Sequence, residues 1–308
     1  MQVFDLSQPI PKDAQNSIMA IGNFDGVHLG HQMLISTAHK KAKDRNLPVA
    51  VLTFEPHPRR VFRPEDPPFR ITPLPLKLQR FREFGIDIVY LYPFDWNLAS
   101  LSAEDFIQQV LKDKINPQDI IIGEDFHFGH NRTGNIEMLK NAGFSVTSIQ
   151  LLTDTHHGII SASRIRGTLQ SGHMNEANQL LGWPWEIQGI VEHGNKRGRE
   201  IGYPTANVAL GETIHPAYGI YASWVRIEDE NKWYIAATNI GIRPMFKVET
   251  GLVETHLLDF NDNLYDKILH IRPIKKLRDE MKFDSIEELV IQMKKDCELT
   301  RTICLANT

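Results

Sequence analysis

The chain has 308 residues, of which 42% are hydrophobic and 23% are charged, and its formal net charge is −4 at pH 7. This length allows two domains with separate cores, and the slightly acidic balance argues against a nucleic-acid partner. No apolar run approaches the roughly 20 residues that a membrane-spanning helix needs, and the N-terminus lacks the basic and apolar regions of a signal peptide. We therefore expect a cytoplasmic protein that does not associate with membranes, and whose two cysteines, Cys297 and Cys304, are reduced thiols.

Strands and helices alternate between residues 17 and 151. The predicted strands are 17–24, 48–54, 86–91, 119–122 and 145–151, and the predicted helices are 31–46, 76–84, 102–113 and 136–142. A strand–helix–strand order produces a parallel sheet, because each crossover returns the chain in the same direction. The stretch 56–75 is rich in proline and arginine, so we expect a loop there. The N-terminal half is therefore predicted to be an α/β domain with a doubly wound, Rossmann-like parallel sheet.

Short β-rich runs separated by turns replace this alternation after about residue 185. The predicted strands are 185–193, 218–227, 232–240, 252–258 and 267–273. Their regular spacing is typical of an antiparallel β-barrel. A final helix is predicted over 285–299, with Ser285 and Glu288 forming a capping box. We expect one domain over residues 1–184 and a second over residues 185–308.

A glycine-containing turn directly follows the first strand of this α/β region. Residues 22–31 read GNFDGVHLGH. Such a turn lets backbone N–H groups face an anion, and the helix that follows adds its positive N-terminal end. His28 and His31 fall on one face of the first helical turn, where two imidazoles can hydrogen-bond one triphosphate. The alternative is a tight turn with two surface histidines, but the agreement of glycines, strand and spacing favours a nucleotide-phosphate site.

Doubly wound sheets bind ligands at the carboxyl ends of their strands. The segments expected to converge there are 23–31, 53–58 and 123–129. Further along, Ser161 would cap a helix, and the guanidinium groups of Arg164 and Arg166 would meet phosphate oxygens. A solvated helix face is the alternative for the two arginines. The set suits nucleotidyl transfer, in which the enzyme mainly positions groups and neutralises charge, with Mg²⁺ on the phosphates.

Histidines and aromatic residues near the predicted strand ends allow other interpretations. One alternative is a metal centre built from His57, His127 and His130. No cysteine or acidic residue accompanies them at a familiar zinc spacing, so the flanking Phe126 and Phe128 favour a flat organic ring. These two phenylalanines could equally belong to the core, and Asp125 could be an ordinary turn residue.

Four motifs in chain order resemble the adenylyltransferase half of bacterial bifunctional riboflavin kinase/FAD synthetases. They are GNFDGVHLGHQ, TFEPHP, GEDFHFG and ISASRIR. The resemblance implies that ATP and FMN become FAD and pyrophosphate. The residues it assigns are Asn23, His28, His31, Ser161, Ser163, Arg164 and Arg166 around the ATP phosphates, and Asp125, Phe126 and Phe128 toward the flavin. Ala162 departs from the family, which usually has a second serine there, so one hydroxyl donor is lost.

A second candidate site lies in the C-terminal half. The glycines and basic residues of 193–207, Gly198 among them, are expected to form a flap over phosphates. Thr205 and Asn207 alternate in an extended segment, and their oxygens suit Mg²⁺. A surface hairpin with a charged tip is the alternative. Glu254 lies on a strand with apolar neighbours and could take a hydroxyl proton from a phosphate acceptor, whereas the alternative is an outward-facing glutamate.

Four further motifs resemble the riboflavin kinase half of the same family. They are GREIGYPTAN, PAYGIYA, NIGIRPMF and VETHLLDF. The resemblance implies that riboflavin and ATP become FMN and ADP. It assigns Thr205 and Asn207 to Mg²⁺–ATP, Glu254 to the role of general base on the riboflavin 5′-hydroxyl, and Arg278 to the flavin end. The sequence therefore predicts a nucleotidyltransferase domain followed along the chain by a riboflavin kinase-like barrel.

Two departures from the kinase motifs keep other functions open. Met245 replaces a usual threonine, and Asp266 stands where a glycine commonly follows Leu-Tyr. One alternative is an FMN adenylyltransferase whose barrel binds flavin without turning it over. The other is a flavin sensor with no enzymatic activity. The expected partners are small molecules in each case, and the sequence specifies no oligomeric state.

Overall fold

A computed structural model describes the whole chain except residues 156–157, 195–197, 199–200, 246–247 and 307–308, and between 243 and 250 it describes only the backbone. Two compact units are present. The first comprises Met1–Pro67 and Thr72–Ser161, and the second comprises Pro68–Ile71 and Ala162–Thr308. The chain passes from the first unit to the second between Ser161 and Ala162. The predicted boundary at residue 184 separates functional domains, and it stays a prediction.

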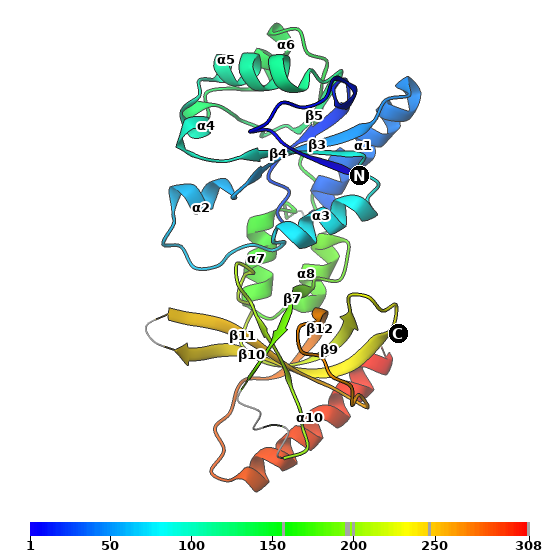
Figure 1. Ribbon diagram of the computed structural model, residues 1–308, viewed down its shortest axis with the longest axis vertical. Coiled ribbons are helices and arrows are strands. Elements are labelled where there is room, and N and C mark those ends of the chain that lie inside the picture. Colours follow the sequence, from blue (N-terminus) through cyan, green and yellow to red (C-terminus); the bar gives the residue numbers. More distant parts are fainter. Residues whose placement is uncertain (156–157, 195–197, 199–200, 246–247, 307–308) are drawn as a thin grey trace. The chain divides into compact units, whose positions relative to one another are not determined.

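A six-stranded parallel sheet forms the centre of the first unit, in the order β1-β4-β3-β2-β5-β6 (Figure 1). The strands are β1 (Gln2–Asp5), β2 (Ile18–Ile21), β3 (Val49–Glu55), β4 (Ile88–Pro93), β5 (Asp119–Gly123) and β6 (Val146–Ile149). The strand order reverses at β2, which has β3 on one side and β5 on the other. Ligands bind at such a switch point in doubly wound sheets, so the turn after β2 lies where a ligand site is expected. The edge strand β1 had no counterpart among the predicted strands.

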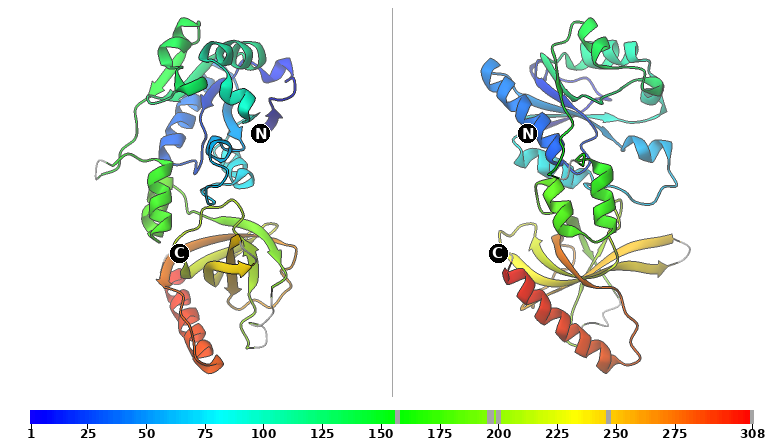
Figure 2. Two further views of the ribbon diagram at one scale, coloured as in Figure 1. Left: turned by 90° about the vertical axis from the view of Figure 1, so that its left-hand side faces the viewer. Right: turned by 180° about the vertical axis from the view of Figure 1, so that it is seen from behind.

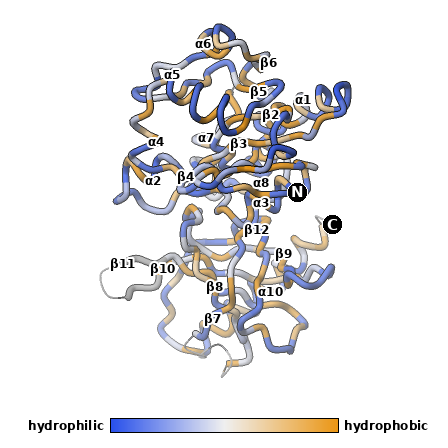
Figure 3. Tube along the Cα trace, turned by 45° about the horizontal axis from the view of Figure 1, so that its top comes forward, coloured by the Kyte–Doolittle hydropathy of each residue, from blue (hydrophilic) through white to orange (hydrophobic). Residues whose placement is uncertain are grey.

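Helices cover both faces of this sheet, which confirms the doubly wound prediction (Figures 1 and 2). On one face α1 (Leu29–Arg45) and α3 (Leu74–Glu83) pack on Ile18 and Ala20 of β2. On the other face η2 (Phe106–Ile115) and α6 (Ile136–Asn141) join Met19 and Ile21 in a separate core. This alternation along one strand follows from the two-residue period of β structure, and Figure 3 shows hydrophobic stretches running through the sheet strands.

Shorter helices complete the first unit. They are η1 (Lys12–Ala14), α2 (Pro58–Phe62), α4 (Trp96–Ser100), α5 (Ala103–Asp105) and η3 (His130–Arg132). Helix α2 lies inside the stretch 56–75 that was expected to be a loop, so that expectation was wrong for its five residues, and also for Leu74 and Pro75, which begin α3. His57 caps this helix, because its Nδ1 accepts the N–H of Arg59 at 3.1 Å. Proline at the first helical position also favours helix initiation there.

The second unit is a closed antiparallel barrel with the strand order β10-β11-β8-β7-β12-β9. The strands are β7 (Ile187–Glu192), β8 (Ala206–Ala209), β9 (Gly219–Ile227), β10 (Trp233–Met245), β11 (Val248–Leu257) and β12 (Ile268–Arg278). Helices α7 (Ala162–Gln170) and α8 (Met174–Leu181) precede the barrel, and α10 (Ile286–Ala306) packs along β9 and β10 (Figure 2). The predicted barrel and terminal helix are confirmed, and α10 continues beyond its predicted end at residue 299.

Ser285 begins α10 as predicted, since its Oγ accepts the N–H of Glu288 at 3.1 Å. Cys304, near the other end of α10, is buried, and its Sγ lies 3.6 Å from the carbonyl oxygen of Ser223. Cys297 and Cys304 are both thiols, as expected, and burial raises the pKa of each to about 11. No helix in the described part of the chain is both long enough and apolar enough to cross a membrane.

Asp119 joins three elements of the first unit. It begins β5, and its side chain is fully buried. Its Oδ2 accepts hydrogen bonds from Lys41 Nζ at 2.8 Å and Ser145 Oγ at 3.0 Å, and lies 3.3 Å from Arg45 Nη2. A buried carboxylate is stable only with such partners, so this residue ties α1 and the start of β6 to the sheet.

We expect the substitution Asp119→Ala to lower the free energy of unfolding by about 2 kcal/mol, because charge-assisted hydrogen bonds of this kind contribute on that scale. Urea unfolding followed by circular dichroism measures the change. The matched control is Asp44→Ala, an exposed aspartate on α1, which should change stability by less than about 0.5 kcal/mol. Equal midpoints for the two variants would show that the Asp119 contacts add nothing to stability.

Candidate active sites

The turn between β2 and α1 has an unusual backbone. Phe24, Gly26 and Val27 have φ angles of 51°, 86° and 38°. Left-handed conformations are costly for residues other than glycine and persist only where the surroundings enforce them. Here Thr72 N donates to Asp25 Oδ1 at 3.0 Å, and Gly26 N donates to Thr72 Oγ1 at 2.8 Å. Asp25 and Thr72 are buried, so they hold the turn that leads into α1.

Two histidines stand at the start of α1. His28 directly precedes the helix, and His31 lies in its first turn. Their rings stack with centroids 3.7 Å apart, as the three-residue spacing predicted. A Cβ at Gly30 would lie 3.1 Å from His28 Cε1 and 3.7 Å from the carbonyl oxygen of Ile160. The structure therefore brings Ser161, the residue after Ile160, to the end of α1 that carries the histidines.

A fully buried lysine on α3 lies beneath this turn. Lys77 Nζ is 3.4 Å from the backbone oxygen of Asn23, 3.4 Å from Thr53 Oγ1 and 3.5 Å from Glu55 Oε2. Asn23 follows β2, and the other two residues lie at the end of β3, so Lys77 joins two strand ends at the switch point. Sequence reasoning did not single out Lys77. The available signal was a lysine among the apolar positions of the predicted helix 76–84.

The environment of His31 keeps its imidazole neutral. Burial lowers the pKa of His31 well below its usual value, and the nearby His28 and Lys77 lower it further. A neutral imidazole has one N–H donor and one acceptor nitrogen. The Nδ1 atom of His31 is buried and makes no hydrogen bond with the described residues. His31 can therefore serve a ligand at neutral pH as a hydrogen-bonding group.

The segment after β5 contains the residues predicted to face the flavin. Asp125 is exposed, and a Cβ at Gly123 would lie 3.0 Å from its Oδ1. Phe128 is only 7% exposed and packs on Phe106 in the core, with ring centroids 5.4 Å apart. Phe126 stacks on Phe128 at 5.7 Å and is partly exposed. The core interpretation therefore holds for Phe128, while a flavin contact by either phenylalanine stays a prediction.

The alternative metal centre finds no support in the described residues, among which no three His, Cys, Asp or Glu side chains cluster as metal ligands. His57 caps α2, and His127 and His130 are exposed.

An aromatic surface that the sequence analysis missed lies at the carboxyl ends of β3 and β4. Phe62 and Trp96 are 52% and 66% exposed. Their rings meet edge to face at 5.5 Å, and Phe62 meets Phe94 in the same way at 5.5 Å. Exposed aromatic clusters of this kind mark binding surfaces, but Phe62 is distant in the chain from the neighbouring Phe94 and Trp96, and no sequence motif connects them.

Helix α7 carries the predicted phosphate-binding arginines. Arg164 Nη2 forms an ion pair with Glu176 Oε1 at 3.1 Å, and Arg166 Nε donates to the carbonyl oxygen of Phe69 at 2.9 Å. Ser163 is exposed on the same helix. These residues belong to the second unit, whereas the histidines belong to the first. Their convergence on one ATP therefore stays a prediction.

Strand register brings the predicted kinase residues together. Glu254 on β11 is paired directly with Asn207 on β8. Side chains of directly opposed residues point to the same face of the sheet, with Cβ atoms about 4.5–5.5 Å apart. The neighbouring Val253 and Thr255 are fully buried inside the barrel, so Glu254 and Asn207 lie side by side on its outer face.

The connection between β7 and β8 passes over the predicted magnesium ligands. A Cβ at Gly194 would lie 2.5 Å from Asn207 Nδ2, and one at Gly198 would lie 3.8 Å from Thr205 Oγ1. The backbone of this connection therefore lies against both Thr205 and Asn207. The remaining flap residues, 195–197 and 199–200, are outside the described residues.

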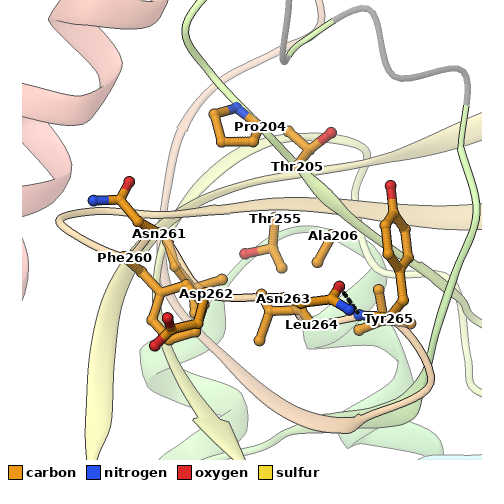
Figure 4. Close-up of a pocket in the computed structure, with 12 residues that line it drawn as sticks. Pro204, Thr205, Ala206, Thr255, Phe260, Asn261, Asp262, Asn263, Leu264 and Tyr265 are labelled. Atoms are coloured by element: carbon orange, nitrogen blue, oxygen red, sulfur yellow. Dashed lines mark hydrogen bonds between the residues drawn. The ribbon is translucent and has the colours of Figure 1, made fainter.

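A cavity of about 530 Å³ opens beside Thr205. Thr205 and Thr255 line its barrel side, and Phe260, Leu264 and Tyr265 line it from the β11–β12 connection (Figure 4). The remaining lining residues are Val191, Pro204, Ala206, Leu257, Asn261, Asp262 and Asn263. About half of the lining residues are polar, so the cavity combines apolar walls with many hydrogen-bonding groups.

Arg278, at the end of β12, binds Asp296 on α10. Its Nη2 lies 2.7 Å from Asp296 Oδ2, and its Nε lies 3.1 Å from Oδ1. The guanidinium of Arg278 is already bonded to Asp296, so a flavin would have to contact the same group. A flavin contact by Arg278 stays a prediction. Asp266 has a φ of 64°, which explains why glycine is common at this position. The side chain of Met245 is outside the described part of the structure.

Comparison with known proteins finds two family models in succession along the chain. A FAD synthetase family model matches residues 10–164, and a riboflavin kinase family model matches residues 181–304. A bifunctional riboflavin kinase/FMN adenylyltransferase of Buchnera aphidicola is 40% identical over 299 residues, which cover 95% of each chain. The protein of that name from Bacillus subtilis is 39% identical over 307 residues, which cover 96% of each chain.

A solved structure named as a macrolide-efflux protein from Streptococcus pneumoniae superposes with a TM-score of 0.86. It is 34% identical in sequence, and the match covers 97% of this chain and 98% of that one. The two family models in this order, together with relatives of the same name over nearly the full length, place the chain in the family of bifunctional riboflavin kinase/FMN adenylyltransferases.

Proposed function

We propose that this protein makes FAD from riboflavin in two steps, one in each unit. The barrel transfers the γ-phosphate of ATP to riboflavin, which gives FMN and ADP. The parallel-sheet unit joins FMN to the AMP part of a second ATP, which gives FAD and pyrophosphate. The observation that carries the proposal is that each unit has its own group of phosphate-directed side chains, the stacked His28 and His31 in one and the register pair Asn207 and Glu254 in the other.

In the barrel, the cavity beside Thr205 accommodates the adenine, and the triphosphate extends toward Asn207. A carboxylate oxygen of Glu254 takes the proton of the riboflavin 5′-hydroxyl as that oxygen attacks the γ-phosphorus. The hydroxyl of Thr205 and the amide oxygen of Asn207 are hard donors that fit Mg²⁺, and these residues would hold it. When bound, Mg²⁺ neutralises charge on the phosphates. The backbone of Gly194 keeps the Asn207 amide in place.

In the parallel-sheet unit, an FMN phosphate oxygen attacks the α-phosphorus of ATP and pyrophosphate leaves. The nucleophile is already an anion, so the site needs no strong base. His28, His31 and the N-terminal end of α1 bind phosphate oxygens, while Lys77 places a positive charge behind the turn. The exposed rings of Phe62 and Trp96 offer a surface for the flavin. Arg164 and Arg166 complete the phosphate contacts in this proposal.

Both steps consume ATP, so we place the protein in the cytoplasm, with small molecules rather than nucleic acid as its partners. The direct test is a chromatogram of flavins after incubation with riboflavin, ATP and Mg²⁺. FMN should appear first and FAD should follow. Formation of FMN alone, of FAD only from added FMN, or of neither product would each contradict the two-step assignment.

Replacing His31 with alanine should abolish FAD formation from FMN and leave FMN formation from riboflavin unchanged. The reason is that His31 contributes a phosphate contact in the first unit only. His39→Ala is the matched control, because His39 lies two turns further along α1. Each step is assayed separately with its own substrate. Equal loss of both steps in His31→Ala would show that the two activities share one site.

The variant Glu254→Gln keeps the size of the side chain and removes the base. We expect kcat for FMN formation to fall by about 10²-fold or more, while FAD formation from FMN continues at the normal rate. Glu228→Gln, an exposed glutamate after β9, is the control. A kinase rate within a factor of about two of the unmodified protein would exclude Glu254 as the base.

Gly194→Ala tests the packing over Asn207. The added methyl group would overlap the Asn207 amide, so we expect a lower kinase kcat and a higher Mg²⁺ concentration for the half-maximal rate, with normal FAD formation from FMN. Gly167→Ala is the control, because a Cβ there meets nothing within 4 Å. Normal kinase kinetics in Gly194→Ala would mean that the position of the Asn207 amide does not matter for phosphoryl transfer.

A further inference from the structure

Asn239 on β10 has a buried side-chain oxygen with no hydrogen-bond donor. Its Oδ1 is inaccessible to solvent and accepts no hydrogen bond from the described residues. Buried polar atoms in folded proteins are almost always paired, because burial removes the hydrogen bond to water. This unsatisfied acceptor lies in the kinase unit and belongs to none of the groups used so far. It therefore suggests a donor supplied by a ligand.

Asn239 lies in one cross-strand row with the kinase residues. The row of directly paired residues across β8, β11, β10, β9 and β12 is Asn207, Glu254, Asn239, Ile220 and Arg278. Paired residues present their side chains to the same face, and neighbouring strands are about 4.8 Å apart. Asn239 is therefore one strand away from Glu254, on the side opposite Asn207.

The geometry of phosphoryl transfer indicates which end of this row faces the nucleotide and which end faces the acceptor. The attacking and leaving oxygens lie roughly in line, on opposite sides of the transferred phosphorus. With the nucleotide on the Asn207 side of Glu254, the rest of the acceptor molecule extends past Asn239 toward Arg278. Riboflavin carries a chain of secondary hydroxyl groups next to its terminal hydroxyl. These O–H groups are the donors that a carbonyl oxygen requires.

Two groups that flank Asn239 on the sheet supply no such donor. Gly241 follows two residues later on the same face of β10, and a Cβ there would collide with the carboxylate of Glu280. A carboxylate only accepts hydrogen bonds when ionised. Glu254, on the neighbouring strand, is also a carboxylate, so both flanking groups are acceptors like Asn239 Oδ1 itself.

We propose that Asn239 binds a secondary hydroxyl of the ribityl chain and so orients the terminal hydroxyl toward Glu254. The proposal rests on the kinase activity proposed above. It makes Asn239 a residue that selects polyol-bearing flavins over flavins with a plain alkyl chain. Glu254 takes the proton, whereas Asn239 positions the molecule that carries it.

The test compares riboflavin with a flavin whose 5-hydroxypentyl chain keeps the terminal hydroxyl and lacks the secondary ones. In Asn239→Leu, kcat/KM for riboflavin should fall about 5- to 10-fold, the loss expected for one neutral hydrogen bond. The value for the hydroxypentyl flavin should stay the same, so that the preference for riboflavin disappears. If the analogue is not phosphorylated, its inhibition constant against riboflavin replaces kcat/KM and should likewise stay unchanged.

A matched control separates this role from ordinary packing. Thr300 on α10 also has a buried side-chain oxygen that makes no hydrogen bond within the described part of the chain, and it lies outside the row. Thr300→Val should leave the preference for riboflavin intact. Asn239→Leu should melt no lower than the unmodified protein, since it removes an unsatisfied acceptor, and it should still convert FMN to FAD.

Asn239→Ser provides a second variant, because its hydroxyl can still accept a hydrogen bond, and it should retain part of the preference even if Asn239→Leu folds poorly. Equal losses for both flavins, or no loss for riboflavin in either variant, would overturn the role of Asn239. Failure of the unmodified protein to phosphorylate riboflavin would instead overturn the proposed function.

Discussion

The pairing register of β11 determines which polar side chains meet on the barrel. β11 has β8 on one side and β10 on the other, so the single residue Glu254 is paired with both Asn207 and Asn239. A slip of one residue would turn Val253 or Thr255 outward and move Glu254 into the barrel. The buried Val253, Thr255 and Leu257 prevent such a slip, because their apolar and hydroxyl groups pack the interior. The hydrophobic packing of the barrel therefore places the proposed catalytic groups.

In the first unit, the proposed phosphate-binding groups are positioned by a turn and a helix rather than by strand pairing. Its phosphate-directed groups stand at the beginning of a helix, on a turn that adopts left-handed conformations and is held by buried Asp25 and Thr72. Lys77 joins the neighbouring strand ends beneath that turn. Burial and the adjacent His28 and Lys77 keep His31 neutral, so in the proposed site His31 contacts phosphate as a hydrogen-bonding group, beside the N-terminal end of α1.

Much of the fold followed from local sequence patterns. Continuous apolar runs predicted β2, β3 and β5, and the Ser285 and Glu288 pair predicted the start of α10. β1 and β8 were not among the predicted strands. Neither has the fully apolar run that identified β2, which is equally short. Helix α8 was missed although its buried residues, Met174, Ala177, Leu180 and Leu181, recur at helical spacing.

The candidate sites were predicted unevenly. The spacing of His28 and His31 predicted that they share one face of the helix. The motif resemblance assigned Asn207 and Glu254 to one site, and the pairing of β8 with β11 brings them together. Lys77 was missed, because its contacts join segments that are distant in the chain. Asn239 begins the NIGIRPMF motif, but the motif alone did not assign it a role. Arg278 was predicted to lie near the flavin, yet its pairing with Asp296 depends on where α10 packs, which sequence periodicity does not specify.

The central claim is that each unit transfers a different phosphorus atom of ATP. The most direct measurement follows two labels through the conversion of riboflavin. With ATP labelled at the γ-phosphorus, the label should appear in FMN and persist in FAD. With ATP labelled at the α-phosphorus, it should appear in FAD and be absent from FMN. Label from the α-phosphorus in FMN, or FAD that carries no γ-label when made from riboflavin, would contradict the account.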